Sequence, residues 1–211
     1  MKPREPSIPW TDPWPLQKLI GHTRLLPRSF YARSTVEVAR GLLGTVLMHR
    51  RAAGRIVEVE AYLGAEDKAA HASRGVTPRT RVIFGPPGHA YVYFVYGMYD
   101  CLNIVAEPDG AAGCVLVRAL EPLAGLEWMR RRRPPARRVE DLASGPARLT
   151  MAMDITRRLN GADLTRGPLT LRAFTVPTAF EIRTSPRIGI RHCAEWPLRF
   201  YLSGNPFVSR A

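Results

Sequence analysis

The chain has 211 residues, enough for one domain with a sizeable core rather than two. Hydrophobic residues make up 45% of it, which predicts a globular fold, and no apolar run reaches the roughly 18 residues of a membrane span. The formal net charge of +13 favours nucleic acid as a partner, with an acidic membrane surface second.

Residues 1–24 are predicted to be a flexible leader, because they are rich in proline and lack the apolar stretch of a signal peptide. A single domain is expected over residues 25–211, and the absence of a secretion signal predicts a cytoplasmic protein. Three scattered cysteines fit a reducing compartment and do not provide a disulfide framework or a Cys-rich zinc site.

The first predicted elements are a helix and two strands. Ser34 and Glu37 have the spacing of a capping box, which predicts a helix through about Leu43. A strand is expected next, at Thr45–His49. Arg55–Leu63 alternates between apolar and polar side chains, which is typical of a half-buried strand.

A β-hairpin and a further strand are predicted in the middle of the chain. The Gly- and Pro-rich region before them is expected to form loops, with one short helix around Asp67–Ser73. Ala90–Val95 and Asp100–Val105 have strand character and enclose Gly97, which predicts a hairpin turn. Gly113–Leu120 alternates again and predicts another strand.

The C-terminal half is expected to contain helices at Leu123–Arg133 and Ala147–Ile155 and short strands at Arg187–Ile190 and Arg199–Leu202. The fold class that follows is α+β. It would be a single domain with one antiparallel sheet, a β-hairpin, and helices packed outside the sheet.

Glu60 and Tyr62 lie on one face of the predicted strand Arg55–Leu63, whose other face is apolar. If this face lines a cavity, Glu60 is a candidate general base; if it faces solvent, Glu58 and Glu60 are surface carboxylates, and the pattern favours neither. A sugar hydrolase with paired carboxylates is a weaker interpretation. Residues two apart on a strand are separated by about 7 Å, more than the roughly 5 Å of retaining enzymes.

The predicted hairpin contains four tyrosines, more than core packing explains. Tyr96 and Met98 flank Gly97 at the turn, where an exposed aromatic ring could enter a base stack and a methionine could form an apolar shoulder. The alternative is a hairpin tip that folds back onto the protein.

Several basic side chains are ambiguous. Arg118 lies on a strand of Val and Leu, so it must be paired or face a polar cleft, and Glu58 or Glu60 could be its partner. The run Arg130–Arg133 is typical of a solvated helix end and could also bind phosphates. His71 by itself is more typical of a structural histidine than of a functional one.

Six blocks of sequence carry a more specific signal. They are RIVEVEAYLGAEDKAAH at 55–71, TPR at 77–79, YVYFVYGMYDCLN at 91–103, VLVRALEPLAG at 115–125, SGPARL at 144–149 and PLRFY at 197–201. In this order they strongly resemble the alkyladenine DNA glycosylase family, also called methylpurine DNA glycosylase. The resemblance runs from about Leu25 to Ser209, and residues 1–24 lie outside it.

The resemblance implies a catalytic group of three residues. Glu60 would be the general base that activates the attacking water, and Arg118 and the backbone carbonyl of Ile188 would hold that water. Hydrolysis of the N-glycosidic bond would leave an abasic site, and the enzyme would not cut the strand.

The resemblance also implies a base pocket. Tyr62, His71 and Tyr93 would enclose the purine after it is flipped from the duplex, and Asn103 at the pocket edge would influence which purines are accepted. Tyr96 would take the vacated place in the DNA. Stacking faces and a wedge are what base flipping requires.

The implied fold is that of the C-terminal domain of methionyl-tRNA formyltransferases, a curved sheet with a protruding hairpin. The implied partner is double-stranded DNA containing 3-methyladenine, 7-methylguanine, hypoxanthine or ethenoadenine. The protein is expected to act as a monomer, to need no metal or organic cofactor, and not to bind a membrane. A non-catalytic nucleic-acid module is the alternative, but it would have no use for Glu60 beside Tyr62 and His71. The charge of +13 disfavours a carbohydrate hydrolase.

Overall fold

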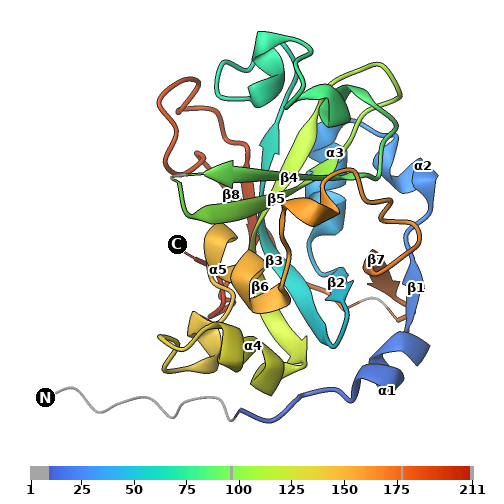
Figure 1. The fold of residues 1–211 in the computed structure, drawn as a ribbon, viewed down its shortest axis with the longest axis vertical. Coiled ribbons are helices and arrows are strands. Elements are labelled where there is room, and N and C mark those ends of the chain that lie inside the picture. The colour runs from blue at the N-terminus through green and yellow to red at the C-terminus, as the bar shows by residue number, and fades with distance from the viewer. Residues whose placement is uncertain (1–9, 96, 177, 210–211) are drawn as a thin grey trace, which may run out of the picture.

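Figure 1 shows a computed structural model of the chain, which describes residues 10–95, 97–176 and 178–209. Within these ranges nine strands form one antiparallel sheet in the order β1-β7-β2-β3-β6-β5-β4, and β9 pairs with both β3 and β8. The strands are β1 (Thr23–Leu25), β2 (Val46–His49), β3 (Ala52–Tyr62), β4 (Ala90–Val95), β5 (Tyr99–Val105), β6 (Cys114–Ala124), β7 (Leu169–Phe174), β8 (Ile182–Ser185) and β9 (Arg199–Leu202).

Short helices pack around this sheet. They are α1 (Leu16–Gly21), α2 (Arg28–Tyr31), α3 (Thr35–Leu42), α4 (Leu126–Arg132) and α5 (Pro146–Met153), with 3-10 turns η1 (His71–Arg74), η2 (Arg81–Phe84), η3 (Val139–Asp141) and η4 (Arg157–Leu159). α3 packs on β3 and β6, and α5 packs on β5 and β6. The predicted α+β class is therefore confirmed. None of the helices in the described ranges is long and apolar enough to cross a membrane.

Strands β3 and β6 form the centre of the sheet and are 11 residues long each. Val57, Val59 and Ala61 are fully buried in the main apolar core, and Glu58 and Glu60 on the other face are fully buried as well. The prediction of a half-buried strand is therefore wrong. The polar face is not open to solvent, because the Ile188 loop and the C-terminal segment at Ser209 lie on it and donate N–H groups to Glu60 and Glu58.

Local signals located several elements correctly. Ser34 and Glu37 form the predicted capping box at the start of α3. Strands β2, β4, β5 and β9 and helix α5 each begin within one residue of the predicted position. These elements have strong capping, turn or alternation signals, which depend only on neighbouring residues.

The junction between β6 and α4 differs from the prediction of a helix beginning at Leu123. Strand β6 continues to Ala124, and the helix begins only at Leu126. Gly125 separates the two elements with a φ of 76°, and a Cβ at this position would come within 2.2 Å of a carbonyl oxygen in the β2–β3 turn. Only glycine fits this close approach without strain.

Two further predicted elements differ from the structure, and both contain a residue of a buried ion pair. The expected helix at Asp67–Ser73 is reduced to the 3-10 turn η1, and the expected strand at Arg187–Ile190 does not form. Asp67 and Arg187 instead face each other in the interior, with Nη1–Oδ2 and Nη2–Oδ1 distances of 2.6 and 2.9 Å.

Residues 10–24 pack on the domain and are not a flexible leader. Leu19 in α1 is fully buried, β1 pairs with β7, and the N–H of Trp14 donates to the carbonyl of Leu123 at 3.0 Å. The packed part of the chain therefore begins before residue 25, and the domain boundary itself stays a prediction. Residues 1–9 lie outside the described ranges.

Asp12 stabilises the start of α4 from a distance along the chain. Its carboxylate accepts the N–H groups of Gly125 and Leu126 at 3.0 and 2.8 Å, and a negative charge is favourable at a helix N-terminus. We expect Asp12→Ala to lower the free energy of unfolding by about 1 kcal/mol, the usual cost of a lost N-terminal cap. Chemical denaturation measures this, with exposed Asp109→Ala as the control, and equal stabilities of the two variants would contradict it.

Candidate active site

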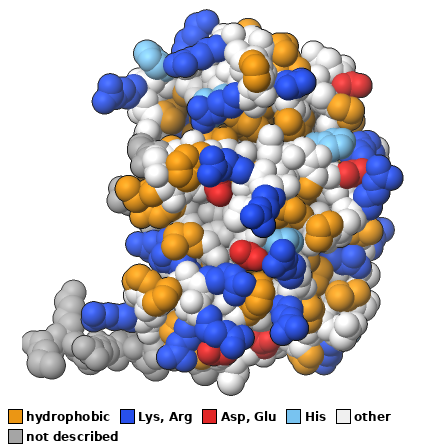
Figure 2. All heavy atoms as spheres, in the orientation of Figure 1, with side chains coloured by type: hydrophobic (Ala, Val, Ile, Leu, Met, Phe, Trp, Pro, Cys, Tyr) orange, Lys and Arg blue, Asp and Glu red, His pale blue; other side chains and the backbone are white. Residues whose placement is uncertain are grey.

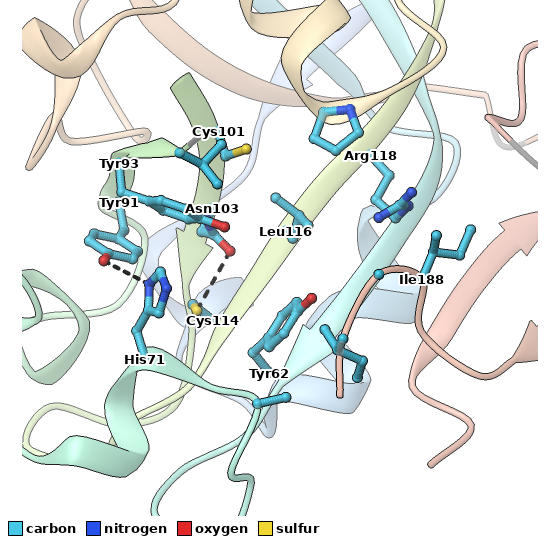
Figure 3. A pocket seen from close by; sticks show the side chains of 15 residues that line it. Tyr62, His71, Tyr91, Tyr93, Cys101, Asn103, Cys114, Leu116, Arg118 and Ile188 are labelled. Carbon is cyan, nitrogen blue, oxygen red and sulfur yellow. Dashed lines mark hydrogen bonds between the residues drawn. The ribbon is translucent and has the colours of Figure 1, made fainter. Parts of the chain in front are cut away.

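A cavity of about 210 Å³ opens beside the β4–β5 hairpin. Figure 3 shows its aromatic residues, with His71, Tyr91 and Tyr93 on one side and Tyr62 on the other. Asn103, from the neighbouring strand β5, also lines it and is almost fully buried. The volume is below the roughly 300–1,000 Å³ typical of drug-sized ligand sites, so a single small planar group is the appropriate occupant.

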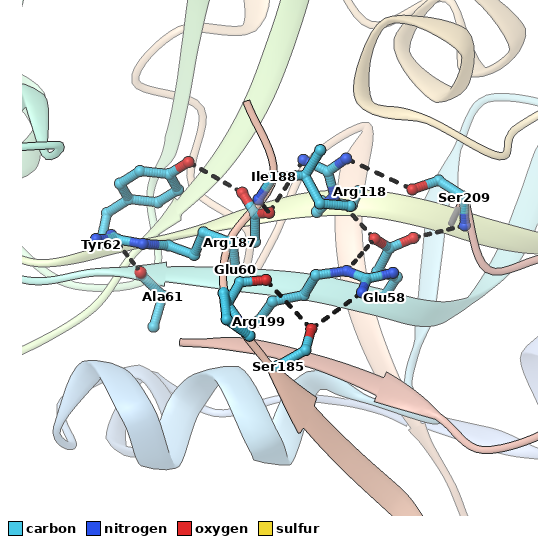
Figure 4. Close-up of polar contacts among 11 residues, drawn as sticks. Glu58, Glu60, Ala61, Tyr62, Arg118, Ser185, Arg187, Ile188, Arg199 and Ser209 are labelled. Atoms are coloured by element: carbon cyan, nitrogen blue, oxygen red, sulfur yellow. Dashed lines mark hydrogen bonds and ion pairs between the residues drawn. The ribbon is translucent and has the colours of Figure 1, made fainter. Parts of the chain in front are cut away.

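The carboxylate of Glu60 lies next to this cavity and is held by two hydrogen-bond donors and one ion-pair partner (Figure 4). The Tyr62 hydroxyl donates to Oε2 at 2.9 Å, and the N–H of Ile188 donates to Oε1 at 2.7 Å. The Arg118 guanidinium, 3.2 Å from Oε1, forms an ion pair with it. Glu60 is fully buried, and Tyr62, Arg118 and Ile188 all line the cavity, so its carboxylate lies directly behind the lining residues.

A second buried carboxylate, Glu58, holds the other side of Arg118. Its Oε1 accepts from Nε of Arg118 and Nε of Arg199, both at 2.8 Å, and its Oε2 accepts the N–H of Ser209 at 2.7 Å. Burial alone would raise the pKa of Glu58, but Arg118 and the hydrogen bonds from Ser209 and Arg199 lower it. Glu58 is therefore ionised.

Arg118 joins the two carboxylates through different nitrogens of one guanidinium. Burial alone would lower its pKa, but the charges of Glu60 and Glu58 raise it. The sequence left open which of the two acids pairs with Arg118, and the structure answers that both do. A planar guanidinium with five N–H groups is suited to such bridging.

The strand register explains how these charges meet. β3 pairs with β6 on one edge and with β9 on the other, which places Ala119 opposite Glu58 and Arg199 opposite Glu60. The β3–β6 register shifts on both sides of Glu58, an irregularity of the bulge type. Bulges re-aim side chains and are frequent beside active sites.

The aromatic side of the cavity is a packed cluster. His71 and Tyr93 meet edge to face with ring centroids 4.6 Å apart, and Tyr93 stacks on Tyr91 at 5.3 Å. Burial, assisted by Arg79 and Arg74, lowers the pKa of His71 to about 4. The imidazole is therefore neutral at physiological pH.

Sequence reasoning missed the residues that support Tyr62 from behind. The Arg187 guanidinium lies over the Tyr62 ring, 4.6 Å from its centroid, and also donates to the carbonyl of Ala61 at 3.0 Å. Its ion pair with Asp67 is fully buried. Asp67 lies inside the block at 55–71, but Arg187 lies in none of the six blocks, so nothing in the sequence marked the pair.

The structure brings most of the predicted site residues together. Tyr62, His71, Tyr93, Asn103, Arg118 and Ile188 line the cavity, and Glu60 lies behind them, bonded to Tyr62 and Ile188. The contact recorded for Ile188 is its N–H on Glu60, whereas the expectation concerned its carbonyl. Met98 lies in the hairpin turn and is 64% exposed, and Tyr96 is outside the described residues.

Basic side chains are spread over the face seen in Figure 2, with hydrophobic side chains between them and few acidic ones. The run Arg130–Arg133 covers the end of α4, where Arg130 and Arg132 stack on Trp10 and Trp128, 5.0 and 3.2 Å from the ring centroids. These contacts favour the interpretation of the run as a helix end packed on the protein's own surface.

The lowered pKa of His71 predicts a pH dependence of stability. Between about pH 4 and 6.5 the unfolded chain binds a proton at this position that the folded protein does not. The contribution of the neutral His71 ring to the free energy of unfolding is therefore complete above pH 6.5 and is lost as the pH falls towards 4. NMR titration of the His71 ring is expected to give a midpoint near 4 in the folded protein, and near 6.5 in urea. A folded-state midpoint above 6 would contradict the burial argument.

Comparison with known proteins identifies the family. A family model described as methylpurine-DNA glycosylase matches residues 29–206. A protein of Methanocella arvoryzae, named "Putative 3-methyladenine DNA glycosylase", is 52% identical over 194 residues, which cover 88% of this chain and 96% of that protein. A protein of Burkholderia cenocepacia with the same name is 49% identical over 202 residues, 94% of each chain. The chain belongs to the methylpurine-DNA glycosylase family and is a DNA N-glycosylase, a hydrolase of DNA repair.

Proposed function

We propose that this enzyme flips a damaged purine out of double-stranded DNA into the cavity and hydrolyses its N-glycosidic bond with a water activated by Glu60. The proposed substrates are 3-methyladenine, 7-methylguanine, hypoxanthine and ethenoadenine. The observation that carries the proposal is a fully buried carboxylate that contacts three of the residues lining a small aromatic cavity. Aromatic faces suit a flipped base, which loses its stacking partners in the duplex.

In the proposed reaction the oxygen of the water forms a bond to C1′ of the deoxyribose as the bond from C1′ to the purine nitrogen breaks. The bonding electron pair leaves with the purine, and Glu60 accepts the proton of the water. Positive charge develops on the sugar in the transition state, and the carboxylate stabilises it. Arg118 and the Ile188 carbonyl would orient the water.

The remaining candidate residues have proposed roles in binding. Tyr62 on one side and His71 and Tyr93 on the other would stack on the base, and Asn103 would select among purines. Tyr96, with Met98 beside it, would fill the space that the base leaves in the duplex. We also propose that the domain acts as a monomer, without a metal or cofactor, and shares the fold of formyltransferase C-terminal domains.

Water is the proposed nucleophile because no lysine among the residues that the structure describes lines the cavity. A glycosylase that cuts the strand needs an amine to form a Schiff base. Within the described residues Lys18 packs on the Trp14 ring and Lys68 donates to a loop carbonyl, and neither lines the cavity. The proposed product is therefore an intact strand with an abasic site.

Replacing Glu60 with glutamine tests the general base directly. Glu60→Gln keeps the size and hydrogen-bonding shape of the side chain but cannot take a proton from water. Single-turnover excision from a lesion duplex is expected to fall by roughly 10²–10⁴-fold while lesion binding persists. The matched control is Glu66→Gln, on an exposed loop position, which should behave as wild type. Near-normal turnover by Glu60→Gln would remove Glu60 from the role of base.

Replacing Tyr96 tests the wedge. Tyr96→Ala removes the ring that would hold the duplex open, so the flipping equilibrium should move back towards the stacked base. The loss of excision should be large for a well-paired lesion and smaller for the same lesion opposite a gap, where unpairing costs less. Excision assays on the two duplexes measure this difference. Earlier thermal melting with an equal loss on both substrates would identify Tyr96 as a packing residue.

A further inference from the structure

Three side chains form a hydrogen-bonded chain that leads from the surface to the cavity. The Nε of Arg79 donates to the hydroxyl of Tyr91 at 3.3 Å, and this hydroxyl lies 3.0 Å from Nδ1 of His71. Figure 3 shows the second contact at the edge of the cavity. Arg79 is exposed, whereas Tyr91 is only 1% exposed, so this series of hydrogen bonds runs from solvent into the interior.

The direction of each hydrogen bond follows from what the groups can donate. A guanidinium donates and cannot accept, so Arg79 occupies a lone pair of the Tyr91 oxygen. Burial raises the pKa of Tyr91, so the phenol keeps its proton. Among the described residues, Nδ1 of His71 is the one acceptor recorded for that buried hydroxyl, so the phenol hydrogen points to His71.

The tautomer of His71 is then determined. Its pKa of about 4 makes the ring neutral, so it carries a single proton. Because Nδ1 accepts from Tyr91, that proton resides on Nε2, the other ring nitrogen. His71 lines the cavity, so the ring offers an N–H donor on the side away from Tyr91.

We propose that Arg79 is a positioning residue, which acts through Tyr91 to hold His71 as an Nε2–H donor for an acceptor on the bound nucleotide. The effect on excision rests on the proposed function, whereas the tautomer is a property of the free protein. The guanidinium also lies 5.2 Å from the centroid of the Tyr93 ring, and this contact keeps it over the aromatic cluster. Without Arg79, the Tyr91 hydroxyl can rotate and both His71 tautomers become accessible.

The variants distinguish the loss of these hydrogen bonds from a general loss of positive charge. Arg79→Met removes the donor at an exposed position and keeps an apolar side chain over Tyr93. Tyr91→Phe removes the hydroxyl and serves as the positive control. Arg157→Met is the matched control: Arg157 lines the same outer groove as Arg79 and stacks on Phe94, 4.2 Å from the ring centroid, but makes no recorded contact with Tyr91 or His71.

Two measurements at pH 7 compare these variants with the wild-type protein. The ¹⁵N shifts of the His71 ring in the free protein report the tautomer, and single-turnover excision of a lesion reports the chemistry. Arg79→Met and Tyr91→Phe are expected to convert an Nε2–H ring into a mixture of tautomers. Excision should fall by about two- to tenfold, the effect of one hydrogen bond. Arg157→Met should keep the wild-type tautomer.

An unchanged Nε2–H tautomer in Arg79→Met or in Tyr91→Phe would overturn the proposal. Weaker DNA binding by Arg79→Met with an unchanged tautomer would identify Arg79 as a phosphate contact instead. A mixed tautomer with wild-type excision would also overturn the positioning role. If the wild-type protein excised none of the lesions, the proposed function would fail, and the ¹⁵N spectra would still decide how the tautomer is set.

Discussion

The buried ion pairs of Arg118 with Glu58 and Glu60 are the interaction on which the rest of the site depends. Two fully buried carboxylates on one strand would repel each other and would be strongly desolvated. Arg118 contacts both, at 2.8 Å and 3.2 Å, and Arg199 adds a second positive charge at Glu58. Removing one partner from such a set typically costs about 3–5 kcal/mol, because it leaves a buried charge without compensation.

This requirement connects segments that are far apart in the sequence. Arg118 comes from β6, Arg199 from β9, and the N–H on Glu58 from Ser209 near the C-terminus. The chain must therefore bring its last strand to the edge of β3, which places Arg199 on Glu58, and its C-terminal segment over the polar face. The same closure holds Glu60 against Tyr62 and the Ile188 loop, so that fold stability and site geometry depend on the same contacts.

Features with local causes could be predicted from the sequence. The capping box of α3, the β4–β5 hairpin and the strand of Glu60 each rest on residues a few positions apart, and the six sequence blocks identified the family. The burial of Glu60 could not be decided from alternation, since it depends on Arg118 and on the Ile188 loop, which are distant in the sequence. The Arg187–Asp67 pair joins residues 120 positions apart, and no periodic pattern marks it. The packing of Leu19 was also missed, because a short helix between prolines and glycine has a weak local signal.

In the proposed reaction this ion-paired carboxylate faces the reacting bond of a base held in the aromatic cavity. The most direct measurement is a crystal structure of the wild-type protein with a duplex whose lesion carries a sugar that resists hydrolysis. We predict that the purine will lie in the cavity between Tyr62 and His71, with an ordered water bonded to both Glu60 and Arg118 and facing C1′. A lesion that remains stacked in the duplex, or a base in the cavity with C1′ out of reach of any water on Glu60, would contradict the account.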